Sequence, residues 1–301
     1  MGTIKLARRM FSHTRVHSWP VTAYLYRRVF RVVADGSDET ADFHGVRLTF
    51  PTVDVGIAPG LLNGYYEQQE LSIYEDLAKV SKTIVDIGGN IGIYACVGAR
   101  HLPADGRVVS FEPVPDNLTR LRQNLEQNDL QDKVTVAATA VGAEAGEITL
   151  HLAEGLTGAH SVSAETVGTA RGSVVVPMVR VDDYLTEQGV GPIDVVKIDV
   201  EGFDVAALRG MSKTLQADSP TLLVEYAPAL MRNCGFEPSE MRDIVFDTYQ
   251  HVFLIDEPRN SVRFTTQDEL AKLDDKKVLL NLIGVNRPEH LSIIKRHAVG
   301  S

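Results

Sequence analysis

The chain has 301 residues, a formal net charge of -10, 44% hydrophobic residues and 23% charged residues. This composition is typical of a globular protein and excludes a disordered one, and no stretch reaches the ~20 apolar residues of a membrane-spanning helix. Residues 1–34 hold seven Lys or Arg and no Asp or Glu. The rest of the chain is therefore strongly acidic, which argues against a nucleic-acid-binding protein.

The first 42 residues predict a basic N-terminal helical extension. Apolar and basic residues are interleaved along residues 4–33, and Pro20 divides them into two helical pieces. We expect these helices to pack on the domain or across a homodimer, with contact to a membrane surface as the alternative. We also expect no secretory signal and no disulfide between Cys96 and Cys234, and hence a cytoplasmic protein.

Residues 43–301 predict one catalytic domain in which strands and helices alternate. A hairpin-like segment at 43–57 comes first. The expected strands are residues 83–87, 107–112, 134–141, 193–199, 221–225, 251–255 and 277–285, and the main helices are 91–101, a segment from 116, 206–215 and 239–249. This order predicts a Rossmann-like, doubly wound, mostly parallel α/β sheet covered on both faces. The glycine-containing segment 142–180 breaks the alternation and predicts a lid or insertion.

The first strand ends in a glycine turn, Asp86-Ile87-Gly88-Gly89-Asn90-Ile91-Gly92. In a doubly wound sheet, ligands bind beyond the carboxyl ends of the strands, where glycine permits close backbone approach and a helix offers free N–H groups. The spacing differs from the dinucleotide fingerprint G-x-G-x-x-G, which disfavours an NAD-dependent oxidoreductase. Asp86 suits a ligand with an ammonium group, such as the amino-acid part of S-adenosylmethionine.

The second strand ends in Glu112, whose carboxylate can accept hydrogen bonds from both hydroxyls of a ribose. Dinucleotide enzymes place an acid similarly, so Glu112 indicates a nucleoside without deciding which one. Asn117 is expected to touch the ribose or adenine, or to lie at the helix N-terminus as a cap. Val141 is expected to lie against the adenine.

These segments resemble the FkbM-type methyltransferases over roughly residues 60–228. The matching runs are 66–67 (YE), 84–92 (IVDIGGNIG), 110–113 (SFEP), 121–128 (LRQNLEQN), 140–142 (AVG), 181–185 (VDDYL), 193–202 (IDVVKIDVEG) and 220–225 (PTLLVE). The resemblance implies the seven-stranded sheet of class I methyltransferases and methyl transfer from S-adenosylmethionine, mostly to a hydroxyl of a sugar or of a polyketide-type natural product.

By this resemblance, the cofactor site consists of Asp86, Gly88, Asn90, Glu112 and Val141, with Gly92 of the same turn, Asn117 and Glu67 close to it. The acceptor is expected to be a saccharide or another small molecule. A non-catalytic module that keeps only the sheet is the alternative, since fold alone does not establish activity. The intact motif residues argue against that alternative.

Three acids lie at neighbouring strand ends. Asp199 and Glu201 follow Lys197 on one side of the fourth strand, by alternation, and Glu225 ends the fifth. A hydroxyl acceptor must lose a proton, so we expect these carboxylates to act as base, to bind acceptor hydroxyls or to hold a divalent cation such as Mg²⁺. The alternative is a salt-bridge network centred on Lys197. His160, in the predicted lid, is a further catalytic candidate, although a single loop histidine is more often simply exposed.

Overall fold

The structure of the chain, a computed structural model, describes residues 36–298. The predicted helices within residues 1–34 lie outside this range. The predicted hairpin is present, but it begins earlier than expected. Strand β1, Asp38–Phe43, pairs antiparallel with β2, Val46–Pro51. Residues 38–42, predicted to belong to the helical extension, are therefore part of a strand, because His44 and Gly45, both with positive φ, form the tight turn of a hairpin.

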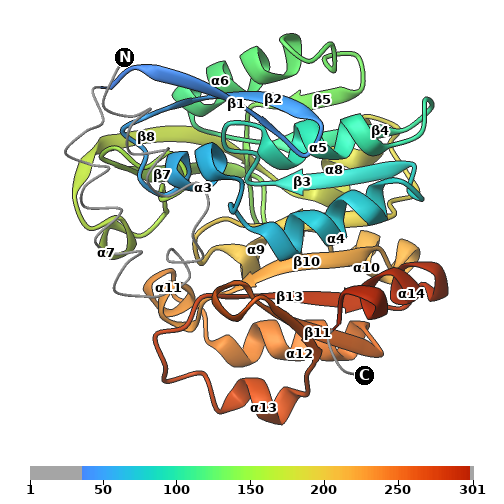
Figure 1. Cartoon of the computed structure of the whole chain (residues 1–301). Coiled ribbons are helices and arrows are strands. Elements are labelled where there is room, and N and C mark those ends of the chain that lie inside the picture. The colour runs from blue at the N-terminus through green and yellow to red at the C-terminus, as the bar shows by residue number, and fades with distance from the viewer. Residues whose placement is uncertain (1–35, 299–301) are drawn as a thin grey trace.

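An eight-stranded sheet lies at the centre of the described residues, in the order β12-β11-β13-β10-β9-β3-β4-β5 (Figure 1). Its strands are β3 Thr83–Ile87, β4 Arg107–Phe111, β5 Val134–Ala137, β9 Val195–Ile198, β10 Thr221–Tyr226, β11 His251–Asp256, β12 Ser261–Phe264 and β13 Leu280–Val285. The adjacent strands β10, β9, β3, β4 and β5 are parallel to one another. Strand β13 is antiparallel to both of its neighbours, β10 and β11. The predicted doubly wound α/β fold is confirmed.

The predicted count of seven strands is wrong, because β12 adds an eighth strand at the edge, antiparallel to β11. This strand has only four residues, of which Val262 is buried and Phe264 is 52% exposed. A run this short carries too little alternation to distinguish an edge strand from a loop.

Helices cover both faces of the sheet. One face carries α4 Gln68–Ala78, α5 Ile93–His101, α6 Pro115–Glu126 and α14 Pro288–His297, whose apolar residues pack together with Ile84 and Val108. The other carries α8 Val181–Glu187, α9 Asp204–Gly210, α10 Ser212–Asp218, α11 Pro228–Asn233, α12 Pro238–Thr248 and α13 Gln267–Ala271, packed with Val85 and Val109. Consecutive strand residues thus face opposite cores. No helix within residues 36–298 is long and apolar enough to cross a bilayer.

The predicted strand 134–141 is divided between two sheets. Its first part is β5, while β6, Ala140–Val141, joins a second sheet in the order β6-β8-β7 with β7, Gly146–Ala153, and β8, Ala170–Val179. A short helix α7, Ala164–Val167, lies between β7 and β8. The predicted insertion at 142–180 is therefore largely this small sheet.

The carboxyl ends of the parallel strands define the functional edge of the central sheet. The chain runs from β3 outward to β4 and β5 and then returns to β9 on the other side of β3. Ligands bind at such a reversal of strand order. There are two further short helices. Helix α3, Ala58–Asn63, precedes α4 in the chain, and the 3₁₀ helix η2, Glu257–Arg259, contacts α4.

Candidate active site

A cavity of about 480 Å³ lies at the carboxyl ends of β3, β4, β9 and β10, a volume in the range of small-molecule sites. The predicted site residues that line it are Glu67, Gly88, Asn90, Glu112, Asn117, Val141, His160, Asp199, Glu201 and Glu225. Asp86 and Gly92 lie outside the lining. The structure thus brings together residues from both halves of the chain, as predicted, while their individual roles stay predictions.

The glycines of the turn are required by the packing of the strand ends. Gly88 has a φ of +90°, and a Cβ on it would lie 1.9 Å from the carbonyl oxygen of Asp199. A Cβ on Gly89 would lie 2.3 Å from Ser110 Oγ. Real atoms do not approach so closely, so any side chain at these two positions would push β3 away from β9 and β4. Gly92, with a φ of +89°, is the N-cap residue of α5.

Asp86 lies beneath this turn, fully buried. Its Oδ2 accepts a hydrogen bond from Ser110 Oγ at 2.9 Å, and its Oδ1 has no partner among the described residues. Burial raises the pKa of Asp86, while Lys197 and Ser110 act in the opposite direction. Asp86 therefore supports the glycine turn from below, and the predicted direct contact with the cofactor stays a prediction.

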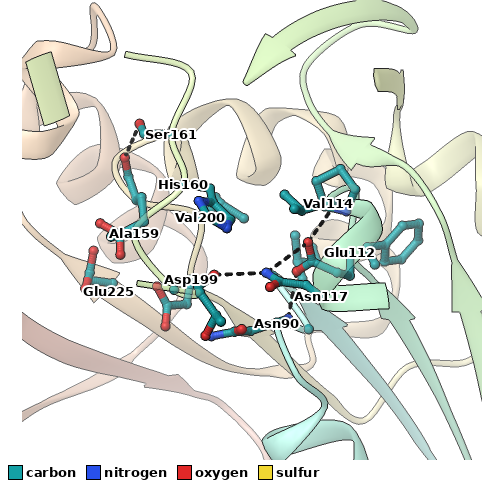
Figure 2. Close-up of a pocket in the computed structure, with 18 of the residues that line it drawn as sticks. Asn90, Glu112, Val114, Asn117, Ala159, His160, Ser161, Asp199, Val200 and Glu225 are labelled. Carbon is teal, nitrogen blue, oxygen red and sulfur yellow. Dashed lines mark hydrogen bonds between the residues drawn. The ribbon is translucent and has the colours of Figure 1, made fainter. Parts of the chain in front are cut away.

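The side chain of Glu112 binds the backbone of the glycine turn and of the segment just before α6 (Figure 2). Its Oε2 accepts from the backbone N–H of Asn90 at 2.7 Å, and its Oε1 accepts from the backbone N–H of Val114 at 2.8 Å. Burial raises the pKa of this carboxyl to about 8, against the effect of the two backbone donors. Oε1 also accepts from Asn117 Nδ2 at 3.5 Å, whereas Oε2 can accept one more hydrogen bond, since a carboxylate oxygen can accept two.

Asn117 holds the loop over the cavity and does not cap a helix. Its Nδ2 donates to the carbonyl of Thr157 at 2.9 Å, while its Oδ1 is buried without a partner among the described residues. Helix α6 has Val114 as its N-cap, without a side-chain cap. Asp54 also holds this loop, because its Oδ2 accepts from the backbone N–H and the hydroxyl of Thr157, at 2.7 and 2.6 Å.

A second group of contacts is centred on Lys197. Its Nζ lies 2.9 Å from Asp199 Oδ2 and 4.5 Å from the centroid of the Tyr94 ring. Burial opposes the charge, but Asp199 and Glu67 raise the pKa of Lys197 and keep it protonated. Tyr94 donates its hydroxyl to Glu67 Oε2 at 2.7 Å. Burial raises the pKa of Glu67 to about 7, in spite of Lys197.

This group agrees with the predicted salt-bridge network for Asp199 but leaves Glu201 and Glu225 outside it. Glu201 lies in the turn after β9 with a φ of 52°, so strand alternation does not place its side chain. Burial and the neighbouring Asp199 raise its pKa to about 8. Glu225 is 7% exposed and its Oε2 has no partner among the described residues. Burial and Asp199 raise the pKa of Glu225 well above its usual range.

The proposed divalent cation finds no support in this arrangement. Within residues 36–298, no group of three or more His, Cys, Asp or Glu side chains is arranged to hold a metal ion. The turn at Glu201 is one reason, because it takes this carboxylate out of the alternation on which the prediction rested. The three acids stay candidates for acceptor binding and proton transfer.

His160 does not have the geometry of a general base. Its Nδ1 accepts from the backbone N–H of Ala153 at 2.9 Å, so the ring proton sits on Nε2. Burial, together with Arg171, lowers the pKa of His160 to about 4, which keeps the ring neutral at pH 7. The ring can donate a hydrogen bond from Nε2 into the cavity but has no free nitrogen to accept a proton.

Asp54 and Tyr94 are site residues that the sequence analysis missed. Asp54 contacts a loop 103 positions later in the chain, and Tyr94 contacts Glu67, 27 positions earlier. Asp54 precedes Gly56 in a local Asx turn, where its Oδ1 accepts from the Gly56 N–H at 2.9 Å. That turn is the only local signal it offers, and it is also an ordinary loop feature.

Comparison with known proteins identifies a family. Residues 86–253 match the methyltransferase FkbM domain. The hexuronic acid methyltransferase AglP of Haloferax volcanii is 28% identical over 152 residues, 50% of this chain and 59% of that protein. The methyltransferase sdnD of Sordaria araneosa is 28% identical over 190 residues, 51% of this chain and 73% of that protein.

Among solved structures, the methyltransferase FkbM from Methylobacillus flagellatus is 15% identical, with a TM-score of 0.42, over 87% of this chain and 60% of that one. The match to AglP spans less than two thirds of that protein's length. The FkbM domain match covers more than half of the present chain and includes the glycine turn together with Glu112, Asp199, Glu201 and Glu225. The chain therefore belongs to the FkbM methyltransferase family.

Proposed function

We propose that the protein transfers a methyl group from S-adenosylmethionine to a hydroxyl oxygen of a saccharide. The observation that carries this proposal is the position of Glu112, which lies beside the glycine turn at the strand reversal and lines the cavity. Membership of a methyltransferase family supports the reaction class, and AglP, named for methylation of a hexuronic acid, supports a saccharide acceptor.

The residues of the donor half fit this cofactor. Oε2 of Glu112 can accept from one further hydroxyl, and Asn90 and Asn117 each have a buried Oδ1 without a partner within residues 36–298. A nucleoside with an amino-acid tail supplies the O–H and N–H donors that such oxygens need. When bound, S-adenosylmethionine supplies a methyl group activated by a sulfonium.

The acceptor half must orient a hydroxyl and receive its proton. Asp199 is held by Lys197, and His160 can only donate, which leaves Glu201 and Glu225 to accept from the hydroxyl. Glu225 suits the role of base better, because it is buried and has an unused oxygen. Its raised pKa makes the ionised carboxylate a stronger base, and the reaction uses the fraction of the protein in which Glu225 has lost its proton.

Two measurements test the proposal. Isothermal titration calorimetry with S-adenosylhomocysteine should show binding, and a matching titration with NADH should show none. Incubation with methyl-labelled cofactor and a panel of sugars and natural-product alcohols, with and without magnesium, should then label a sugar. Heat no different from buffer with S-adenosylhomocysteine would remove the donor, and label only in a natural-product alcohol would replace the acceptor.

We also propose a cytoplasmic location. Both cysteines are free, Cys96 buried in α5 and Cys234 partly exposed, and free thiols are typical of a reducing compartment. Fractionation of cells that express the protein, followed by immunodetection, tests this location.

A further inference from the structure

Carboxyl groups dominate the charged lining of the cavity. Within the described residues, Lys197 is the one Lys or Arg that lines it, and the acidic lining residues are Asp54, Glu67, Glu112, Asp199, Glu201 and Glu225. His160 is neutral at pH 7 and adds no positive charge. The cavity therefore has many carboxyl groups and, within the described residues, a single Lys and no Arg, and a ligand must be compatible with them.

Four of these acids are already satisfied by the protein. Backbone N–H groups donate to Asp54 and Glu112. The Tyr94 hydroxyl donates to Glu67. Lys197 pairs with Asp199 and so is not free to meet a second anion. What is left is the acceptor side, made by Glu201 and Glu225.

Glu225 is the observation that points to a ligand. Its side chain is 7% exposed, it lines the cavity, and its Oε2 has no hydrogen-bond partner among the described residues (Figure 2). A buried polar atom without a partner is destabilising and uncommon. A donor arriving from the cavity would satisfy it.

From this arrangement we infer that the saccharide acceptor carries no negative charge where it meets Glu201 and Glu225. It presents hydrogen-bond donors to them, hydroxyls or an amino group, and a hexuronate is rejected. The inference rests on the proposed function, since it names the class of saccharide. The acceptor inferred for this chain therefore differs from the hexuronic acid in the name of AglP.

The physical reason is the absence of a counter-charge. Burial and Asp199 already raise the pKa of Glu201 and Glu225. A uronate carboxylate beside them would add a further buried negative charge without a free positive partner, which is unfavourable. Hydroxyl groups of a neutral sugar donate to carboxylates without adding charge, and an ammonium group adds attraction. Charge selection of this kind works by repelling the wrong ligand.

Three matched sugars test the inference: a methyl hexopyranoside, the same sugar oxidised to the hexuronate, and its 2-amino counterpart. Calorimetry on protein saturated with S-adenosylhomocysteine measures binding, and labelled methyl transfer gives kcat/KM. We expect the neutral and amino sugars to exceed the hexuronate at least tenfold in both. Equal or better binding and transfer with the hexuronate would overturn the inference and leave the proposed function standing.

Variants assign the selection to the two acids. Glu225→Gln should narrow the gap between neutral sugar and hexuronate in binding at least threefold, and Glu201→Gln provides the same test if the first variant does not fold. Glu126→Gln, an exposed residue of α6, makes the same charge change away from the cavity and should leave the gap as it is. An unchanged gap in both site variants would contradict the assignment.

Failure of the proposed function has a different signature. If S-adenosylhomocysteine does not bind, the donor is wrong. If it binds but none of the three sugars binds or is methylated, the saccharide class is wrong, and this inference is overturned with it.

Discussion

Replacement of Glu112 by Gln tests the donor site most directly. The wild-type carboxylate accepts from the Asn90 N–H at 2.7 Å and from the Val114 N–H at 2.8 Å, one on each oxygen. Glutamine keeps one oxygen and places an NH₂ group against the other N–H. Because hydrogen bonds to charged groups contribute about 1.5–3 kcal/mol, we expect Glu112→Gln to weaken binding of S-adenosylhomocysteine by about 10- to 100-fold.

Isothermal titration calorimetry measures this effect on three proteins, the wild type, Glu112→Gln and the surface control Glu126→Gln. Urea unfolding of each protein shows whether Glu112→Gln is folded before its affinity is compared. A dissociation constant within twofold of the wild type, in a folded Glu112→Gln protein, would refute the assignment of Glu112 to the ribose. The control should bind as the wild type does.

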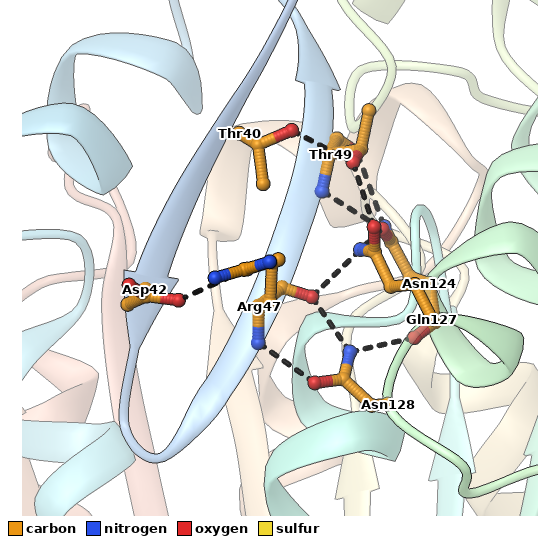
Figure 3. A network of polar contacts seen from close by, with 7 residues as sticks. All are labelled: Thr40, Asp42, Arg47, Thr49, Asn124, Gln127 and Asn128. Atoms are coloured by element: carbon orange, nitrogen blue, oxygen red, sulfur yellow. Dashed lines mark hydrogen bonds and ion pairs between the residues drawn. The ribbon is translucent and has the colours of Figure 1, made fainter.

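Three further perturbations follow from the contacts. Asn124 is buried, and its side-chain amide accepts from the N–H and donates to the carbonyl of Thr49 (Figure 3) and also donates to the carbonyl of Ile91. Asn124→Ala should therefore lower the free energy of unfolding, measured in urea, by about 3–5 kcal/mol, against about 0.5 kcal/mol or less for the exposed Gln123→Ala. Asp54→Ala removes the oxygen that accepts from both the N–H and the hydroxyl of Thr157. This variant should speed hydrogen exchange of the Thr157 amide and raise the KM for the methyl acceptor more than it changes cofactor affinity. The pKa of Glu201 is raised from 4.5 to about 8, so its stabilising effect is complete below pH 4.5 and is lost as the pH rises to 8. The Tm of the unliganded protein should fall over this pH range, and the Tm of the Glu201→Gln variant should fall less steeply.

Local patterns predicted the elements whose residues alone determine them. The run 83–87 is a strand because β-branched residues are buried on both faces of a central sheet, and α12 begins at Pro238, as its proline indicates. The division of 134–141 between two sheets was not predicted, because the partner of β6 is β8, 38 residues later in the chain. The edge strand β12 escaped it because its pairing with β11, not its own pattern, makes it a strand.

The same distinction applies to the site. Gly88 and Glu112 were found because a turn and a strand end are local features. The structure adds that Gly88 is needed for the approach of the Asp199 carbonyl, a contact between strands that no spacing reveals. For His160, the sequence indicated a histidine in a loop, but only the N–H of Ala153 determines which ring nitrogen is occupied.

The acids of the cavity lower the stability of the folded protein. Burial raises the pKa of both Glu201 and Glu225, and Asp199 raises it further, so ionising them costs free energy in the folded chain. Lys197 cannot compensate, because it pairs with Asp199. A fold selected for stability alone would replace such groups with apolar residues of similar volume, since unpaired buried charges destabilise. Their presence at the reversal of strand order, on the wall of a cavity, is explained if a ligand supplies the missing donors. The FkbM family assignment identifies the reaction class, and the unpartnered oxygen of Glu225 indicates which side of the cavity receives the acceptor.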